Sequence, residues 1–278
     1  MSSLGGARVA LLEGRMPGEL ADLVRRHGGE PYSVPAVREL PVERPAEVAA
    51  FVDELAGGAL PVVVCLTGAG VKALFEEADR LGRLPELLAA LRTVTVVCRG
   101  PKPAAVLRRH AVPIALNTPE PYTTRELLEV LAGLDLAGTR VGLLHYGERS
   151  AEFAAALQAR GAHVVELVLY EWLLPEDPAP LRNLVAELLG GRVDAIAFTG
   201  QVQVRHLFQI AAALGKTEDL AHALNTQVAV ASVGPVCTAA LQEHGVMPAV
   251  VPEHPKMGPM VAALARWVEQ HHRNMPAS

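Results

Sequence analysis

Short apolar runs alternate with amphipathic stretches along most of the chain. The runs, such as 62–66 (VVVCL) and 195–198 (AIAF), are strand-length and several are rich in β-branched residues. Between them, apolar residues recur at helical spacing, as in Leu181, Leu184 and Leu188. Strands that alternate with helices in this way form parallel sheets covered by helices on both faces. The pattern therefore predicts an α/β protein.

The same pattern places the individual elements. Strands are expected at 9–12, 62–66, 94–97, 141–144, 164–170, 195–198 and 228–231. Helices are expected at 17–27, 47–56, 71–81, 104–110, 124–131, 151–160, 180–189, 202–214, 236–244 and 257–271. The segments 31–37 and 164–174 are extended, and both are followed by proline and acidic residues. They could be ordinary strands or two antiparallel crossings between lobes.

The order of residues occurs twice in the chain. Residues 54–58 (ELAGG) recur as 187–191 (ELLGG), and residues 71–75 (VKALF) recur as 204–208 (VRHLF). Two copies of about 130 residues predict two similar lobes, because solenoid repeats run only ~20–50 residues. Ligands usually bind in clefts between domains. We therefore expect a binding cleft between the two copies.

Composition narrows the partners that such a protein can have. The 278 residues, 50% hydrophobic and 20% charged, are enough for two domains with substantial cores. A net charge of −5 and 4% aromatic residues argue against nucleic-acid binding by this chain alone. The apolar runs are too short for a membrane span, and the first residues lack the order of a secretory signal. We expect a monomeric cytoplasmic protein without membrane contact.

Four predicted turns follow strand ends, where ligands bind in parallel sheets. Each contains Gly, Ser or Thr and leads into a helix, whose first amides can hold an anion. The candidate residues there are Thr67 and Gly68, Arg99 and Gly100, Thr199 and Gly200, and Gly234 and Thr238. Turn and helix-cap chemistry would explain any one of these turns equally well. Together they favour a shared anion-binding cleft.

Cationic residues also lie in or next to strand-end turns. Lys72, Lys102 and Lys256 are close to strand ends, and Arg15 and Arg149 follow the equivalent first strands of the two copies. Charges also favour exposed loops in general, but a ring of cations would suit a substrate with several carboxylates. The sequence has no HExxH motif, no paired-cysteine site and no GxSxG elbow, so no metal site or serine hydrolase is expected.

Tyr170 ends the extended run 164–169 and is one of 4 tyrosines in the chain. It could be an ordinary packed strand residue. Its phenol could equally be a proton donor that reaches into the cleft.

Several segments taken in order carry a family resemblance. They are 141–144 followed by 161–166 and Tyr170, then 194–199 (DAIAFT), then 231–235 (ASVGP) before a helix that ends at 244–245. In this order they resemble the uroporphyrinogen-III synthase family. The resemblance implies two α/β lobes joined by a two-stranded β-ladder, with one lobe formed by 1–37 and 171–278 and the other by 38–170. The linker strands would lie near 31–40 and 164–174.

The resemblance also implies an activity. Members of this family cyclise hydroxymethylbilane, a linear tetrapyrrole, to uroporphyrinogen III without a cofactor, with inversion of ring D and loss of water. Tyr170 matches the family tyrosine proposed as the acid that assists departure of the hydroxyl. Thr67 and Thr199 match residues that would bind carboxylates, and Gly234 and Thr238 lie in the family's Gly-Pro turn.

Three departures keep other functions open. The segment 99–103 (RGPKP) lacks the small hydroxyl residue frequent in the family, and Val236-Cys237 stands where threonine is frequent. The loop 254–258 (HPKMG) resembles a branch in which the synthase-like module is coupled to a DNA-binding regulatory domain. A non-catalytic tetrapyrrole-sensing module is therefore the alternative. A two-lobed binding protein for another small anion is a third possibility.

Overall fold

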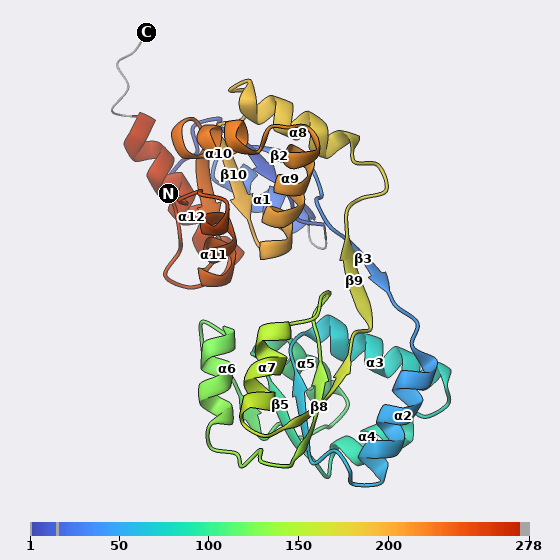
Figure 1. The fold of residues 1–278 in the computed structure, drawn as a ribbon. Helices are drawn as coiled ribbons and strands as arrows, with labels where there is room; N and C mark the ends of the chain where they lie inside the picture. Colours follow the sequence, from blue (N-terminus) through green and yellow to red (C-terminus); the bar gives the residue numbers. More distant parts are fainter. Residues whose placement is uncertain (1, 15–16, 273–278) are drawn as a thin grey trace. The chain divides into compact units, whose positions relative to one another are not determined.

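The computed structural model describes residues 2–14 and 17–272 of the chain. It divides into two compact units: a terminal unit, Met1–Arg38 with Leu173–Ser278, and a central unit, Glu39–Trp172. Each unit has its own parallel sheet with helices on both faces (Figure 1). The predicted α/β class is confirmed.

The central unit is built on a five-stranded parallel sheet in the order β6-β5-β4-β7-β8. Its strands are β4 (Val62–Cys65), β5 (Thr95–Cys98), β6 (Leu116–Asn117), β7 (Arg140–Leu144) and β8 (His163–Leu167). One face is covered by α2 (Pro45–Ala56), α3 (Gly68–Arg80), α4 (Leu84–Leu91) and α5 (Pro101–Arg109). The other face is covered by α6 (Thr124–Leu131) and α7 (Ala151–Ala159). Both faces of the sheet are therefore buried, as the apolar strands require.

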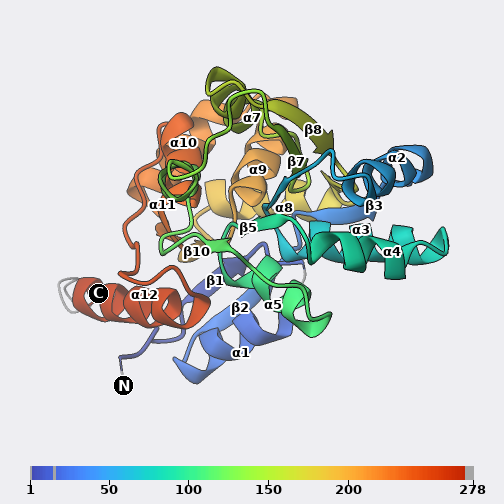
Figure 2. The same cartoon turned by 90° about the horizontal axis from the view of Figure 1, so that it is seen from below.

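The terminal unit has a four-stranded parallel sheet in the order β11-β10-β1-β2. Its strands are β1 (Arg8–Leu11), β2 (Glu30–Ser33), β10 (Ala195–Phe198) and β11 (Ala229–Ser232). One face packs against α8 (Ala179–Leu189), α9 (Gln201–Ala213), α10 (Thr217–Thr226) and α11 (Pro235–Glu243). The helices α1 (Pro17–Arg26) and α12 (Met257–His272) lie together on the other face (Figure 2).

The sequence repeat reappears as a repeat of sheet order. The central order β5-β4-β7-β8 corresponds strand by strand to β11-β10-β1-β2 in the terminal unit. In both sheets the chain changes direction across the sheet at one place, between β4 and β7 and between β1 and β10. Such switch points leave a crevice at the carboxyl ends of the strands, where ligands bind.

Each of the two extended segments leads from a sheet strand into a ladder strand. Residues 31–37 include the end of β2, and β3 (Arg38–Pro41) follows; residues 164–174 hold most of β8 and all of β9 (Tyr170–Leu173). The strands β3 and β9 pair as an antiparallel two-stranded sheet (Figure 1). Both alternatives left open by the sequence therefore occur within 164–174, whereas 31–37 holds part of a sheet strand and ends just before the ladder strand β3.

Some elements differ from the expected pattern. Helix α3 begins at Gly68 and not at Val71, because the Thr67 hydroxyl accepts a hydrogen bond from the Gly70 amide and caps the helix. The helices α4 and α10 and the two-residue strand β6 were not expected.

Gly142 in β7 is required by the packing of α2 on the central sheet. A Cβ atom at this position would lie 2.7 Å from Cε2 of Phe51, a fully buried residue. We expect Gly142→Ala to lower the free energy of unfolding by ~1–3 kcal/mol through overpacking, measured by urea denaturation. The control is Gly133→Ala, where no atom lies within 4 Å of the added methyl group. Equal effects in the two variants would contradict this packing argument.

Candidate functional site

Three neighbouring strands of the central sheet end in polar or aromatic side chains. Thr67 follows β4, Arg99 follows β5 and Tyr146 follows β7, and these strands are adjacent in the order β5-β4-β7. This edge includes the switch point between β4 and β7. The first and third residues of β9, Tyr170 and Trp172, pack beside the same group. We call these five residues the central corner.

Thr67 joins the start of α3 to Tyr170. Its Oγ1 accepts the Gly70 amide at 3.0 Å and lies 2.9 Å from the Tyr170 hydroxyl oxygen. Tyr170 is buried, with 4% of its surface exposed. A hydroxyl at the first turn of a long helix lies at the positive end of the helix dipole. The phenol is thus held by a hydrogen bond at a position that favours negative charge.

Arg99 is a half-buried cation that lies against an aromatic ring. Its guanidinium lies over the Tyr146 ring, 4.9 Å from the centroid. Within residues 2–14 and 17–272, no carboxylate lies within ion-pair distance of this side chain. Burial lowers the pKa of Arg99, whereas the neighbouring Tyr146 and Tyr170 raise it. Because arginine stays charged in proteins, such a side chain is suited to pair with an anionic ligand.

Trp172 and Tyr146 complete the aromatic part of the corner. The Trp172 ring centroid lies 5.5 Å from that of Tyr146 and 6.1 Å from that of Tyr170. The indole Nε1 donates to Glu39 at 3.1 Å. A Cβ atom at Gly147 would lie 2.5 Å from the indole, so only glycine lets the loop after β7 lie flat on Trp172.

Glycines allow the first turns of α3 and α5 to approach other parts of the unit closely. A Cβ atom at Gly68 would lie 3.0 Å from the Lys102 carbonyl oxygen, and one at Gly100 would lie 2.9 Å from the Tyr122 ring. Gly100 also has φ of 96°, a conformation that favours glycine. Since Pro101 and Pro103 have no N–H group, α5 offers fewer amides to an anion than the sequence suggested.

The other candidates of the central unit are exposed. Lys72 forms an ion pair with Glu76 at 3.3 Å, and Arg149 forms one with Glu166 at the same distance. Lys102 is exposed in the first turn of α5.

The terminal unit has a corresponding corner with a different set of contacts. Thr199 follows β10, but its hydroxyl donates to Glu13 and its amide donates to Gln203 at 2.8 Å. The position that corresponds to Arg99 in the repeat is Val233. This corner therefore has an apolar residue at the position of Arg99, and its threonine is bonded to a carboxylate, Glu13.

The remaining described candidates of the terminal unit follow the neighbouring strands β10 and β11 or lie near the start of α12. Gly200 precedes the first residue of α9, and a Cβ atom at Gly234 would lie 2.9 Å from Pro255. Thr238 donates its hydroxyl proton to Ser232 at 2.9 Å, and Lys256 is exposed. Arg15 lies outside the described residues.

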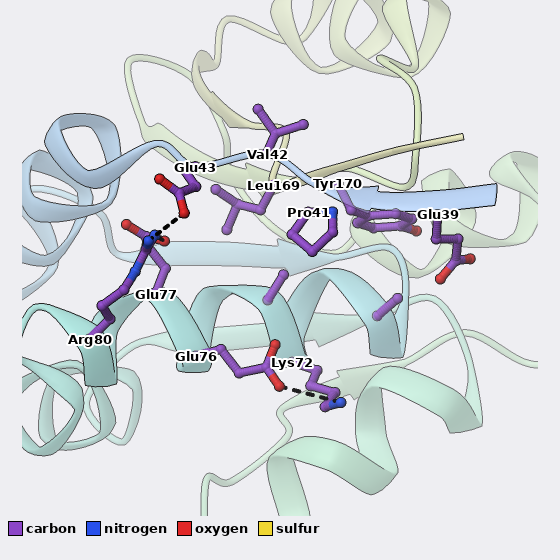
Figure 3. Close-up of a pocket in the computed structure, with 12 residues that line it drawn as sticks. Glu39, Pro41, Val42, Glu43, Lys72, Glu76, Glu77, Arg80, Leu169 and Tyr170 are labelled. Carbon is purple, nitrogen blue, oxygen red and sulfur yellow. Dashed lines mark hydrogen bonds and ion pairs between the residues drawn. The ribbon is translucent and has the colours of Figure 1, made fainter. Parts of the chain in front are cut away.

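A groove of about 410 Å³ runs beside α3 and shares Tyr170 with the corner (Figure 3). Its lining includes the carboxylates of Glu39, Glu43, Glu76 and Glu77. The two cations of the lining are already paired: Lys72 with Glu76, and Arg80 with Glu43 and Glu77. The groove is therefore acidic, and Arg99 is not among its lining residues.

Comparison with known proteins identifies the family. The family model described as uroporphyrinogen-III synthase HemD matches residues 18–262. The chain belongs to the uroporphyrinogen-III synthase family. The resemblance noted in the sequence is confirmed.

Individual relatives agree with this assignment. The chain is 33% identical over 250 residues to a protein of Methanothermobacter thermautotrophicus that carries the provisional name uroporphyrinogen-III synthase, covering 89% of this chain and 92% of the relative. It is 31% identical over 270 residues to the uncharacterised protein YjjA of Bacillus subtilis, covering 95% and 97%. The crystal structure of a mutant uroporphyrinogen III synthase from the extremely thermophilic bacterium Thermus thermophilus superimposes with a TM-score of 0.76 at 30% identity, covering 95% of this chain and 99% of that one.

Two kinds of feature are absent from the described residues of this member of the uroporphyrinogen-III synthase family. The part of the chain that the structure describes contains no group of three or more His, Cys, Asp or Glu side chains that could hold a metal ion. No helix in the same part is long and apolar enough to cross a membrane.

Proposed function

We propose that this chain is a uroporphyrinogen-III synthase, which cyclises hydroxymethylbilane to uroporphyrinogen III with inversion of ring D and loss of water. The observation that carries the proposal is the Tyr170 hydroxyl, 2.9 Å from Thr67 Oγ1, in a corner where Arg99 has no carboxylate partner among the described residues. Membership of the family supports the reaction class.

The charge of Arg99 supports a polycarboxylate substrate in the central corner. A guanidinium and a carboxylate can form two parallel hydrogen bonds, which fixes the orientation as well as the position of the ligand. Arg99 is available for such a pair, and the start of α3 favours negative charge beside it. The groove beside α3, which Arg99 does not line, is rich in glutamates and would repel the substrate. We therefore expect the substrate carboxylates at Arg99 and not in this groove.

The proposed step is proton transfer from Tyr170 to the departing hydroxyl. The hydroxyl leaves as water, and the phenolate that remains is stabilised by the charge of Arg99 and by the Thr67 hydroxyl, which can donate to it. The proton returns to Tyr170 when the closed macrocycle loses a proton from its substituted pyrrole carbon. The atoms balance as loss of one water, and the reaction requires neither an oxidant nor a reductant.

Which isomer forms depends mainly on how the enzyme positions ring D of the substrate. The azafulvene formed by loss of water closes to the I isomer unless ring D is held for attack through a spiro intermediate. A preference of a few kcal/mol is enough, since each ~1.4 kcal/mol is tenfold in rate. Orientation of bound groups can supply ~7–11 kcal/mol, so a corner that fixes one or two carboxylates is sufficient.

The proposal is tested by the isomer composition of the product. Purified protein mixed with freshly prepared hydroxymethylbilane is expected to yield mainly the III isomer, separated chromatographically after oxidation to the porphyrin. A reaction without protein gives the background of the I isomer. Product that contains only the I isomer at every protein concentration would refute the synthase assignment.

One observation supports a second candidate, a tetrapyrrole-sensing module without turnover. In the terminal unit the Thr199 hydroxyl is bonded to Glu13 and its amide to Gln203, so this corner is already satisfied by the protein. A sensing module would bind uroporphyrinogen III saturably, seen as quenching of tryptophan fluorescence, and would give only the I isomer in the assay above.

A further inference from the structure

His145 links the two ends of the loop that carries Tyr146. The residue follows β7 directly, and its side chain is fully buried. Its Nε2 lies 2.6 Å from Glu166 Oε2 on β8, and its Nδ1 accepts the backbone amide of Ser150 at 3.1 Å. Ser150 directly precedes α7 as its N-cap residue, so the ring connects the first residue of the loop to its last.

The two hydrogen bonds define the protonation state of the ring. An amide N–H can only donate, so Nδ1 must carry a lone pair and not a proton. The proton of the neutral ring is then on Nε2, which donates it to Glu166. The second carboxylate oxygen of Glu166 faces Arg149 at 3.3 Å, so β8 contacts the loop at two points.

The loop held in this way carries the groups that support the central corner. Tyr146 lies under the Arg99 guanidinium and beside the Trp172 ring. The Gly147 carbonyl accepts the Trp172 amide at 3.2 Å. The His145 carbonyl oxygen would lie 2.9 Å from a Cβ atom at Gly70, in the first turn of α3. A change in the loop would therefore reach Arg99, Trp172 and the helix capped by Thr67.

We infer that His145 is a positioning residue for the proposed reaction: its neutral ring, bonded to Ser150 and Glu166, holds the loop 145–150 so that Arg99 is placed for a substrate carboxylate. The inference rests on the proposed function. It gives His145 no contact with the substrate, because the side chain is fully buried.

The internal repeat supports a role for this position. The residue that corresponds to His145 in the terminal unit is Glu13, which lies just after β1, a strand of that unit's switch point. Glu13 accepts a hydrogen bond from Thr199 in its own corner. In both units the residue at this position therefore connects the end of a switch-point strand to a neighbouring loop. The central unit uses an imidazole for this contact and the terminal unit uses a carboxylate.

The charged groups that face the ring set the expected pH dependence. Burial lowers the pKa of His145 from its ordinary value of 6.5; Glu166 opposes this shift and Arg149 adds to it. A protonated ring has a proton on both nitrogens and can no longer accept the Ser150 amide. The unfolded chain takes up this proton first as the pH falls below 6.5, so the stabilisation by His145 is complete above that pH and is lost below it.

The test uses variants that remove both hydrogen bonds of His145 or keep the one to Ser150. His145→Ala removes both hydrogen bonds, and we expect it to raise KM for hydroxymethylbilane about tenfold with kcat changed less than about threefold. His145→Asn keeps an acceptor at the Nδ1 position for Ser150 and should recover most of this loss. His206→Asn is the matched control, because His206 is a buried histidine of the terminal unit whose Nδ1 contacts the Ala36 carbonyl. It should leave KM unchanged.

A spectroscopic measurement separates this inference from the proposed function. Trp172 and Trp267 are the 2 tryptophans, so in a Trp267→Phe background the emission reports on Trp172 alone. We expect this emission to shift to longer wavelength as the pH falls through the lowered pKa of His145, below its ordinary value of 6.5, and to stay constant over the same range with His145→Asn. This result would support the positioning role even if the protein formed no III isomer. The same titration in both proteins, or a normal KM in His145→Ala, would overturn it.

Discussion

Replacing Tyr170 with phenylalanine is expected to slow formation of uroporphyrinogen III by about 100-fold, the lower range for loss of a general acid. The phenylalanine ring fills the same space, and only the hydroxyl 2.9 Å from Thr67 Oγ1 is lost. The fold should be retained, because Thr67 still caps α3 through the Gly70 amide. The measurement is the initial rate of III isomer formation at saturating hydroxymethylbilane, with circular dichroism as the check on folding.

The comparison variants for this prediction are Thr67→Ala and Lys102→Ala. Each would remove one proposed contact with a substrate carboxylate, and Thr67→Ala also removes the cap of α3. We expect a cost of ~1–2 kcal/mol or less for each. The rate should therefore fall more in Tyr170→Phe than in either variant. An unchanged rate in Tyr170→Phe would mean that water or the substrate supplies the proton.

Replacing Arg99 with methionine is expected to raise KM by about 10- to 100-fold, which corresponds to one hydrogen-bonded ion pair of ~1.5–3 kcal/mol. Methionine keeps an apolar side chain beside Tyr146 but removes the charge that lies over its ring. Stability should be maintained or increased, since no carboxylate within the described residues loses a partner and a half-buried charge is removed.

The control for Arg99 is Arg109→Met, at the exposed end of α5. It removes the same charge from the same unit, so a general effect of net charge on a polyanionic substrate would appear in both variants. We expect KM to change less than about twofold in the control, the effect of a screened surface charge. Equal increases in KM in the two variants would mean that Arg99 acts on the substrate only through the net charge of the protein.

The fold was predictable where the sequence has a strong periodic signal. Valine-rich runs such as Val62–Val64 marked the strands, and the recurrence of ELAGG as ELLGG marked the duplication. Helix α4 (LPELLAAL) was missed because it is short, has Pro85 at its second position and is apolar on most sides. The strand β6 has only two residues, which is too short for any periodic pattern.

The candidate site was predictable in its members but not in their pairings. Thr67, Arg99 and Tyr170 could be selected because each lies at or beside a predicted strand end. The contacts of Tyr170 with Thr67 and of Arg99 with Tyr146 depend on which strands are neighbours, and periodicity carries no information on sheet order. Tyr146 and His145 closely follow the predicted strand 141–144. This place after a strand end was the one sequence feature that could have marked them as site residues.

The two copies share the same scaffold and differ in the residues of their corners. Both units place a threonine after the central switch-point strand, Thr67 after β4 and Thr199 after β10. Only the central corner combines the threonine with Arg99, since the repeat has Val233 at the corresponding position. The two corners are therefore expected to contribute unequally to binding, with the central corner holding the anionic groups.

The most direct measurement is a crystal structure of the protein with uroporphyrinogen III bound. A carboxylate of the tetrapyrrole is expected within hydrogen-bond distance of the Arg99 guanidinium, and the Tyr170 hydroxyl is expected to face the macrocycle. A tetrapyrrole bound with every carboxylate remote from Arg99, or seated in the glutamate-lined groove beside α3, would contradict the account.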